Sequence, residues 1–373
     1  MATITMMMTK TIINIEQQLL MVKNSIYYFV LYLAISNFGF TVCAQQAISK
    51  IAFGSCANQS ARLPIFNVVV EHKPDLFVFL GDNVYGDTHN MDTLAAIYGR
   101  MAAKPTFKNL KQNVPLIATW DDHDYGQNDA GRHFPEKEKS KQVFLDFFDE
   151  PKESERRTRP GVYQSYYYQN NGKTTQVILL DCRTFRDDLI RFDKRKHKCL
   201  KNGRHRHAFA PYTVADSTML GEEQWKWLEE ELKKPADLRI IGSGSQFGIE
   251  YNGYESWANF PHEQKRMFNL IKSTQANGVL FISGDVHYAE ISKINEPGLY
   301  PIYDITASGL SSTWEFATPN KNRIEGPVMQ NHFGLITVNW QLPDPEIALE
   351  IWDVDNKKAI SYLVKLSTLK FSN

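Results

Sequence analysis

Four short apolar runs in this 373-residue chain each end directly in a cluster of polar, chemically reactive residues. The runs are Ile51–Phe53, Leu76–Leu80, Leu116–Thr119 and Val279–Ile282, and their composition is typical of buried strands. In open α/β sheets, ligands bind beyond the carboxyl ends of the strands. If the four strands are parallel, their polar clusters meet at one edge. This pattern predicts one functional site built from four separate segments.

The remaining apolar pattern predicts an α/β part followed by a β-rich part. Further strands are expected at Val177–Leu180, Leu238–Ile241, Tyr303–Thr306, Phe333–Trp340, Ile347–Trp352 and Ile360–Leu366. Helices are expected at Leu63–Val70, Leu94–Met101, Gln142–Phe148, Glu222–Leu232 and Gln264–Ile271. Strand–helix alternation up to residue 300 indicates βαβ units. We therefore expect two packed sheets with helices outside them, without an internal repeat.

The N-terminal segment differs from the rest and predicts a secretory signal. A lysine precedes an apolar run at residues 26–34, and small residues follow before residue 45, as in a cleavable signal peptide. We expect residues 1–44 to be this signal with an upstream extension, Met21 being an alternative start. Residues 45–373 would then form one secreted or periplasmic domain. The alternatives are a retained anchor and a lipid on Cys43, and only these predict membrane association.

The overall charge excludes a strong global attraction to polyanions. Lysine plus arginine and aspartate plus glutamate both total 42, so no nucleic acid partner is expected. An anionic substrate would need local charge, for which bound metal is the natural candidate. The basic stretch at residues 194–207 could recruit such a substrate, but its composition favours a solvated insertion loop.

Three cysteines remain once the signal is set aside, and an odd count in an exported chain indicates a thiol with another role. Cys182 and Cys199 could form a disulfide. Cys56 follows Gly54 and Ser55, and it could be a metal ligand, a core thiol or a nucleophile. A loop rich in aspartate stabilises a thiolate poorly, whereas a metal ion does so directly, which favours the ligand.

The second and third clusters carry hard anionic ligands. Asp82 and Tyr85 follow the second strand, where a carboxylate can bridge two cations and a phenolate suits a trivalent metal; ordinary turn chemistry is the alternative. Residues 121–124 place three carboxylates around His123, which costs repulsion unless cations neutralise it. The alternative is a solvated loop with a helix cap at Asp124. His123 could act as a general acid on the leaving group.

The fourth cluster and a glycine-rich loop complete the candidates. Asp285 and His287 alternate at the end of a strand, so both could face one metal pair; a core histidine is the alternative. The run at residues 242–245 lacks the lysine and the spacing of a phosphate-binding loop. Gln246, which follows it, is long enough to reach a metal or its water, although a plain turn also fits.

The ordered motifs resemble those of PhoD-like alkaline phosphatases, a branch of the calcineurin-like metallophosphoesterases. The motifs that carry the resemblance are Phe53–Gln59, Gly81–Tyr85, Thr119–Gly126 and Ser283–His287, supported by Asn128–Gly131 and Ile305–Gly309. The resemblance implies an α/β fold, a four-layer α/β/β/α sandwich of two mixed sheets flanked by helices. It also implies a cluster of Fe(3+) with Ca(2+).

The resemblance further implies a role for each matching residue. Iron would be held by Cys56, Asp82, Tyr85 and His287, and calcium by Asp82, Asp122, Asp285 and Gln246, with Asp121 as the alternative to Asp122. His123 falls at the catalytic histidine of the superfamily. The implied reaction is in-line attack of a metal-bound hydroxide on a small-molecule or polymeric phosphate ester.

Two departures from the family pattern bear on the substrate. Family members often carry a β domain ahead of the first motif, and Cys56 follows the expected cleavage point too closely for one. The predicted C-terminal strands, in place of a long helix, imply a more open pocket. Three other functions stay open: a phosphodiesterase or phospholipase D-like hydrolase of envelope polymers or nucleotides, a metal-stabilised surface protein without turnover, and a hydrolase that depends on Cys56 as nucleophile.

Overall fold

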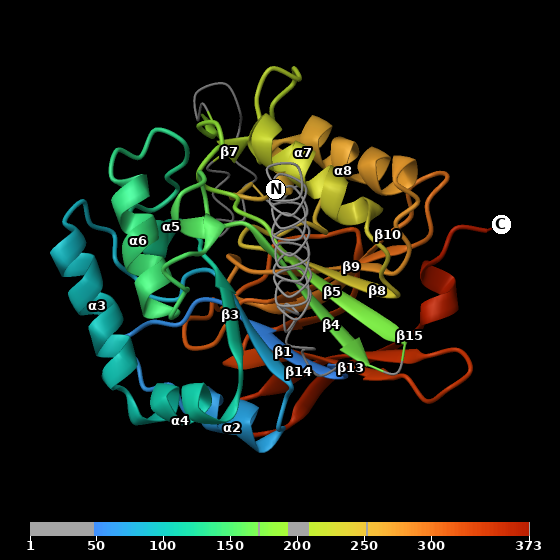
Figure 1. Cartoon of the computed structure of the whole chain (residues 1–373), viewed down its shortest axis with the longest axis horizontal. Helices are drawn as coiled ribbons and strands as arrows, with labels where there is room; N and C mark the ends of the chain where they lie inside the picture. Colours follow the sequence, from blue (N-terminus) through green and yellow to red (C-terminus); the bar gives the residue numbers. More distant parts are fainter. Residues whose placement is uncertain (1–47, 171, 193–208, 251–252, 373) are drawn as a thin grey trace, which may run out of the picture. The chain divides into compact units, whose positions relative to one another are not determined.

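The computed structural model describes residues 48–372 except for residues 171, 193–208 and 251–252. Two large sheets form its centre, one with the strand order β15-β14-β13-β1-β2-β3 and one with the order β12-β10-β11-β9-β8-β5-β4 (Figure 1). A small third sheet pairs β6 (Ile190–Arg191) with β7 (Phe209–Ala210). The predicted signal, Cys199 and the basic stretch at 194–207 lie outside the described residues.

The first sheet joins strands from both ends of the described chain. Its strands are β1 (Lys50–Gly54), β2 (Leu76–Leu80), β3 (Leu116–Thr119), β13 (His332–Asn339), β14 (Glu346–Asp353) and β15 (Lys358–Lys365). The first three are parallel, and β13 then pairs antiparallel with β1, placing Gly334 opposite Phe53. A side chain at Gly334 would collide with the Phe53 ring. The C-terminal strands therefore extend the first sheet and do not form a separate β-rich part.

The second sheet has a parallel centre and antiparallel edges. Its strands are β4 (Gln164–Asn170), β5 (Lys173–Leu179), β8 (Leu238–Ser243), β9 (Val279–Ser283), β10 (Ala289–Ile294), β11 (Ile302–Ala307) and β12 (Arg323–Val328). The neighbours β5, β8, β9 and β11 are parallel. The four strands that lead into the polar clusters are thus divided between two sheets, because β9 does not join β1, β2 and β3.

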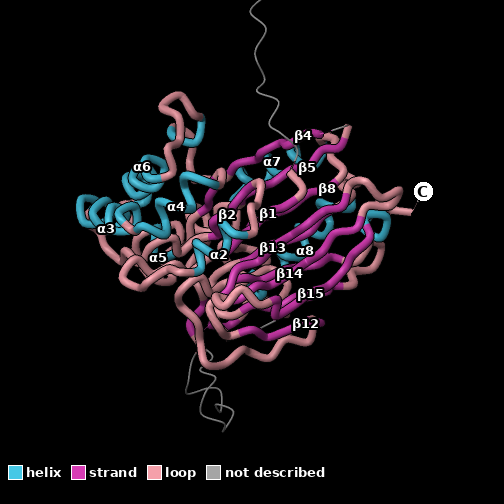
Figure 2. The backbone as a smooth tube through the Cα atoms, turned by 90° about the horizontal axis from the view of Figure 1, so that it is seen from below, coloured by secondary structure: helices cyan, strands magenta, loops and turns pink. Residues whose placement is uncertain are grey.

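The helices cover the outer faces of the two sheets (Figures 1 and 2). They are α2 (Ile65–Glu71), α3 (Met91–Ala103), α4 (Pro105–Asn113), α5 (Asp122–Tyr125), α6 (Lys137–Phe147), α7 (Gly221–Lys233) and α8 (Pro261–Ser273), with short 3-10 helices at Glu155–Arg157, Trp257–Asn259 and Leu366–Leu369. Helix α3 begins after Asn90, whose side chain accepts the Thr93 N–H, and ends where Pro105 opens α4.

Strand β2 shows how the layers are built. Its alternate residues Leu76, Val78 and Leu80 pack into the core that the two sheets share with α7 and α8. Phe77 and Phe79 point the other way, into the core beneath α2, α3, α4 and α6. Successive side chains of a strand face opposite sides, so a wholly apolar strand is expected where both faces are covered. The predicted fold, two mixed sheets between two helical layers, is confirmed.

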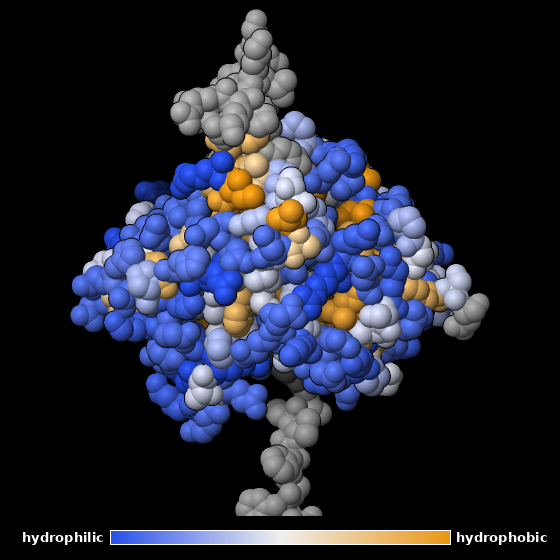
Figure 3. Space-filling model, turned by 90° about the horizontal axis from the view of Figure 1, so that it is seen from above, coloured by the Kyte–Doolittle hydropathy of each residue, from blue (hydrophilic) through white to orange (hydrophobic). Residues whose placement is uncertain are grey.

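Hydropathy varies over one face of the molecule (Figure 3) and among its helices. The face in Figure 3 is mostly hydrophilic, with apolar residues in small separate groups. Within the described ranges, no helix combines the length and the apolar character that a membrane span requires.

Candidate metal centre

The loops that follow β1, β2, β3 and β9 meet at the carboxyl ends of their strands. Cys56 N donates a hydrogen bond to Gly81 O at 3.4 Å and Ala57 N donates one to Asp82 O at 2.8 Å, which joins the first two loops. A Cβ at Gly81 would collide with the Cβ of Asp121, so glycine at this position lets the second and third loops approach. The structure therefore brings these clusters together although their strands lie in different sheets.

Four of the predicted ligands have a left-handed backbone. The φ angles of Cys56, Asp82, Asp285 and His287 are 61°, 49°, 76° and 58°. This region is uncommon for residues other than glycine, and it persists where surrounding contacts hold it. Here the Ser308 hydroxyl provides such a contact, since it accepts the His287 N–H at 3.0 Å. The shared strain indicates that these loops are fixed to aim side chains inward.

Cys56, Asp82 and His287 form the first ligand group, in which one donor atom of each lies within 4.8 Å of the others. The Cys56 Sγ is 3.3 Å from Asp82 Oδ2. Burial raises the pKa of the Cys56 thiol to about 12, so a cation is needed to keep it as a thiolate. The His287 Nδ1 donates to Ser312 O at 2.9 Å, which leaves the Nε2 lone pair for a metal.

Tyr85 lies against this group. Its hydroxyl is buried and has no hydrogen-bond partner among the described residues. Burial, followed by the charges of Cys56 and Asp82, raises the pKa of this phenol. The Tyr85 backbone is tied to the first loop, because its N–H donates to Gln59 Oε1 and its carbonyl accepts from Gln59 Nε2. An orphaned buried hydroxyl beside three donor atoms fits a fourth ligand.

Asp82, Asp122 and His123 form the second group and share Asp82 with the first. The second oxygen of Asp82, Oδ1, is buried without a partner in the described part of the chain. Burial and then neighbouring acidic groups raise the pKa of Asp82 well above its usual range. Burial also opposes ionisation of Asp122, but the Arg183 charge and the Asp129 N–H outweigh it and lower its pKa. A carboxylate at the junction of two groups can bridge two cations.

His123 is held by a carboxylate that the sequence did not single out. Its Nδ1 lies 2.7 Å from Asp87 Oδ2, so Nδ1 carries the proton of this hydrogen bond and Nε2 is available for substrate. Burial disfavours the imidazolium, but the hydrogen bond to Asp87 and the charge of Asp122 outweigh it and raise the pKa of His123. The ring also lies 4.3 Å from the Tyr85 ring, between centroids.

Asp124 is a structural residue. It is buried, its Oδ1 accepts the N–H groups of Asp82 at 3.2 Å and Asp121 at 2.7 Å, and its Oδ2 accepts the Asn83 N–H at 3.3 Å. The alternative weighed for this cluster, a helix cap at Asp124, is thus partly correct, because Asp121 and Asp124 form a capping box at α5. The cap is buried rather than solvated, and it fixes the loop that carries Asp82.

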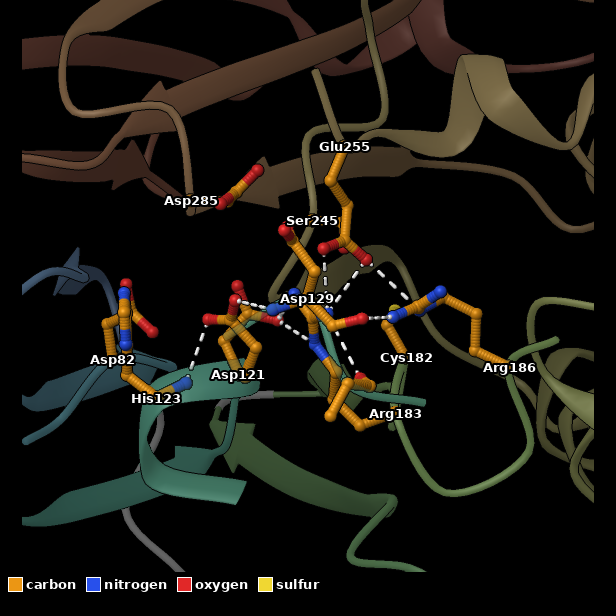
Figure 4. A network of polar contacts seen from close by, with 12 residues as sticks. Asp82, Asp121, His123, Asp129, Cys182, Arg183, Arg186, Ser245, Glu255 and Asp285 are labelled. Carbon is orange, nitrogen blue, oxygen red and sulfur yellow. Dashed lines mark hydrogen bonds and ion pairs between the residues drawn. The ribbon is translucent and has the colours of Figure 1, made fainter. Parts of the chain in front are cut away.

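Asp285 and Gln246 have different surroundings. The pKa of Asp285 is raised well above its usual range by burial and then by the charge of Asp121, which indicates a carboxylate facing the same acidic pocket (Figure 4). The Gln246 Nε2 donates to Glu290 Oε1 at 2.8 Å and Thr306 Oγ1 at 3.0 Å. Its Oε1 is buried without a partner among the described residues. Ligation by Gln246 stays a prediction.

Sequence reasoning missed an arginine pair at the fifth strand end, after β5. Arg183 is fully buried; its Nε and Nη2 lie 2.6 and 2.5 Å from Asp121 Oδ1, and its Nη1 lies 2.8 Å from Glu255 (Figure 4). Arg186 Nε lies 3.0 Å from the same Glu255. The ion pair gives Asp121 an arginine counter-ion, whereas Asp122 lies in the second ligand group, and ligation by Asp122 stays a prediction. The sequence feature that could have indicated this arginine pair is the polar run that follows the strand at 177–180.

A third acidic group adjoins the other two. It consists of Asp122, Asp129 and Glu255, so Asp122 is common to the second and third groups. Burial, followed by the charges of Glu255 and Asp122, raises the pKa of Asp129 to about 6. Cys182, also after β5, is a free and buried thiol with its Sγ 3.4 Å from Ser243 Oγ. Its predicted partner Cys199 lies outside the described residues.

The residues present fit bound cations. Buried carboxylates gather around the first two groups, and unpaired buried oxygens of Asp82 and Tyr85 face no donor among the described residues. Arg183 and Arg186 are committed to Asp121 and Glu255. Unpaired buried charge is costly, so cations are expected to complete this centre.

Comparisons with known proteins agree with this chemistry. A family model described as PhoD-like phosphatase matches residues 51–333. Alkaline phosphatase D of Bacillus subtilis (strain 168) is 26% identical over 262 residues, which is 61% of this chain and 41% of that protein. The chain therefore spans less than half the length of this relative.

Two solved structures share the fold. The structure of PhoD is 18% identical with a TM-score of 0.62, over 86% of this chain and 73% of that one. GAP50, titled the anchor in the inner membrane complex of Plasmodium, is 14% identical with a TM-score of 0.52, over 88% of this chain and 90% of that one.

Proposed function

The chain belongs to the PhoD-like phosphatase family, and we propose on this basis that it is a metal-dependent phosphoric ester hydrolase. The observation that carries the proposal is the pair of adjoining ligand groups that share Asp82, with His123 at their edge. For occupancy we propose iron at the group of Cys56, with Tyr85 as a further ligand, and calcium at the group of Asp122. The donor set supports this division, because thiolate and phenolate suit iron and carboxylates suit calcium.

The bound cations would supply Lewis acidity, which neutralises phosphate charge and acidifies water. In the reaction that we propose, a water molecule releases one proton to solvent and attacks phosphorus in line with the ester oxygen, and the bond from phosphorus to that oxygen breaks. In its imidazolium form, His123 keeps the Nδ1 proton on Asp87 and delivers the Nε2 proton to the leaving oxygen. Burial raises the pKa of Cys56 to about 12, which argues against this thiol as the nucleophile.

The substrate class and the location are proposals of the same kind. We propose small-molecule or polymeric phosphate esters as substrates, with diesters as the alternative. Export is proposed from the composition of residues 1–44, which lie outside the described residues.

Elemental analysis of the purified protein tests the proposal, with nitrophenyl phosphate hydrolysis followed through chelation and metal restoration. Iron with calcium, and activity that falls and returns with metal, would support it. Full activity in metal-free protein would overturn it. Tightly bound metal without turnover of either nitrophenyl phosphate or its bis-ester would indicate a metal-stabilised binding protein. Faster turnover of the bis-ester would identify a phosphodiesterase.

A further inference from the structure

A chain of aromatic rings begins at the candidate ligand His287. The Trp314 ring lies 5.1 Å from the His287 ring, and it stacks on Phe316 at 5.0 Å with an angle of 17° between the ring planes. The Tyr254 ring lies 5.1 Å from Trp314 on another segment, all distances being between centroids. Tyr254 immediately precedes Glu255 of the third acidic group. The rings therefore join the segment that follows His287 to the segment that carries Glu255.

The segment that carries two of these rings is fixed to the candidate ligands. Trp314 N donates to His287 O at 2.9 Å, and Ser311 N donates to Cys56 O at 3.2 Å. Ser312 O accepts the Nδ1 proton of His287. Rings attached in this way keep a constant position relative to the metal ligands, as a substrate-binding wall requires.

The burial of the rings differs from that of a core cluster. Trp314, Phe316 and Tyr254 are each half-buried, whereas the candidate ligands Cys56 and Asp82 are buried. Each ring therefore keeps part of its surface accessible. Loop residues that stay partly accessible beside a catalytic centre are typical of binding surfaces.

We propose that Trp314, Phe316 and Tyr254 form a subsite that stacks a flat aromatic ring in the leaving group of the phosphate ester, as in a nucleotide. This inference rests on the proposed phosphoesterase function. Aromatic side chains bind bases through their faces with little dependence on base identity. The subsite would select esters with an aromatic group over purely aliphatic ones.

AMP and ribose 5-phosphate provide a matched comparison, because both release a primary alcohol and differ only in the base. We expect kcat/KM of the native enzyme to favour AMP by about tenfold. Phe316→Leu and Tyr254→Leu should each reduce this ratio severalfold. Trp340→Leu is the control, since Trp340 is a half-buried tryptophan whose Nε1 donates to Ile48 O, at the end of β13.

Two results would overturn the subsite: a ratio near one in the native enzyme, or variants whose kcat/KM falls equally for both esters at unchanged metal content. Absence of all ester hydrolysis would instead reject the proposed function. In that case, calorimetry on the metal-loaded protein measures the affinities for AMP and ribose 5-phosphate and so tests the subsite without turnover. Tighter AMP binding that Phe316→Leu removes would support the subsite, and equal affinities would reject it.

Discussion

Asp87 Oδ2 and His123 Nδ1 lie 2.7 Å apart, so a carboxylate on the loop after β2 orients the imidazole at the start of α5. Asp87 belongs to none of the three candidate ligand groups, although His123 belongs to the second, and the φ angle of Asp87 is 42°. The pair explains how the imidazolium of His123 keeps Nδ1–H on Asp87 and presents Nε2–H to a leaving oxygen. It also makes the role of Asp87 separable from metal binding.

Asp87→Asn should therefore slow the hydrolysis of alkyl phosphates more than that of nitrophenyl phosphate. An alkoxide needs a proton as it leaves, whereas nitrophenolate does not, and general acids typically contribute 10²–10⁴-fold. We expect kcat for an alkyl ester to fall by about 10- to 100-fold and kcat for the nitrophenyl ester by only a few-fold. Elemental analysis should find the metal content unchanged. Equal losses for the two esters would refute proton donation by His123.

Cys56→Ala should remove the iron and most of the activity, because the thiolate is a proposed ligand in a buried group. We expect the loss to be at least about 10- to 100-fold, the range known even for outer residues of metal sites. Cys182→Ala is a matched control, since Cys182 is also a buried free thiol but contacts Ser243. Retention of full iron by an inactive Cys56→Ala protein would favour the nucleophile over the ligand.

Arg183→Met should destabilise the fold strongly. The change leaves Asp121 and Glu255 buried without their counter-ion, and breaking a buried pair costs about 3–5 kcal/mol. The exposed pair of Arg132 and Asp187, 2.7 Å apart, is the control, and Arg132→Met should cost at most about 1 kcal/mol. Chemical denaturation measures both values. Similar small losses in the two variants would show that the buried network is not needed for stability.

Much of the site could be predicted because its residues follow apolar strands. Strand ends can be read from local sequence, and the parallel order of β1, β2 and β3 brings their loops to one edge. The assignment of β9 to the second sheet could not be predicted, since its apolar run fits either sheet. The antiparallel addition of β13 to β1 was missed for a similar reason: pairing between residues almost 300 positions apart leaves no local pattern.

The roles of charged residues were harder to predict than their presence. Arg183 and Glu255 are 72 positions apart, and nothing in the sequence around either indicates a buried ion pair. The pairing gives Asp121 a counter-ion and so distinguishes it from Asp122, which is adjacent and chemically identical. Likewise, Asp87 became recognisable only through its contact with His123. These contacts can be recognised only from the three-dimensional arrangement of the residues.

His332 gives a further test, away from the proposed ligands. Its side chain is fully buried, Nδ1 donates to Gln330 O at 2.7 Å, and Nε2 has no partner among the described residues. Burial lowers the pKa of His332 to about 4, compared with about 6.5 for a solvated histidine. The folded protein therefore holds the neutral ring where the unfolded chain would already bind a proton.

The free energy of unfolding should consequently fall as the pH decreases from about 6.5 to about 4. Above this window both states hold neutral His332, and below it both are protonated, so the contribution is complete at neutral pH and lost by about pH 4. Across this window, the contribution of His332 to the free energy of unfolding changes by about 3 kcal/mol. His332→Asn keeps a donor for Gln330 and should show a flatter profile in chemical denaturation between these pH values. The control is His133→Asn, at an exposed histidine, which should leave the pH profile of the native protein unchanged. Parallel profiles for the native protein and His332→Asn would contradict the prediction.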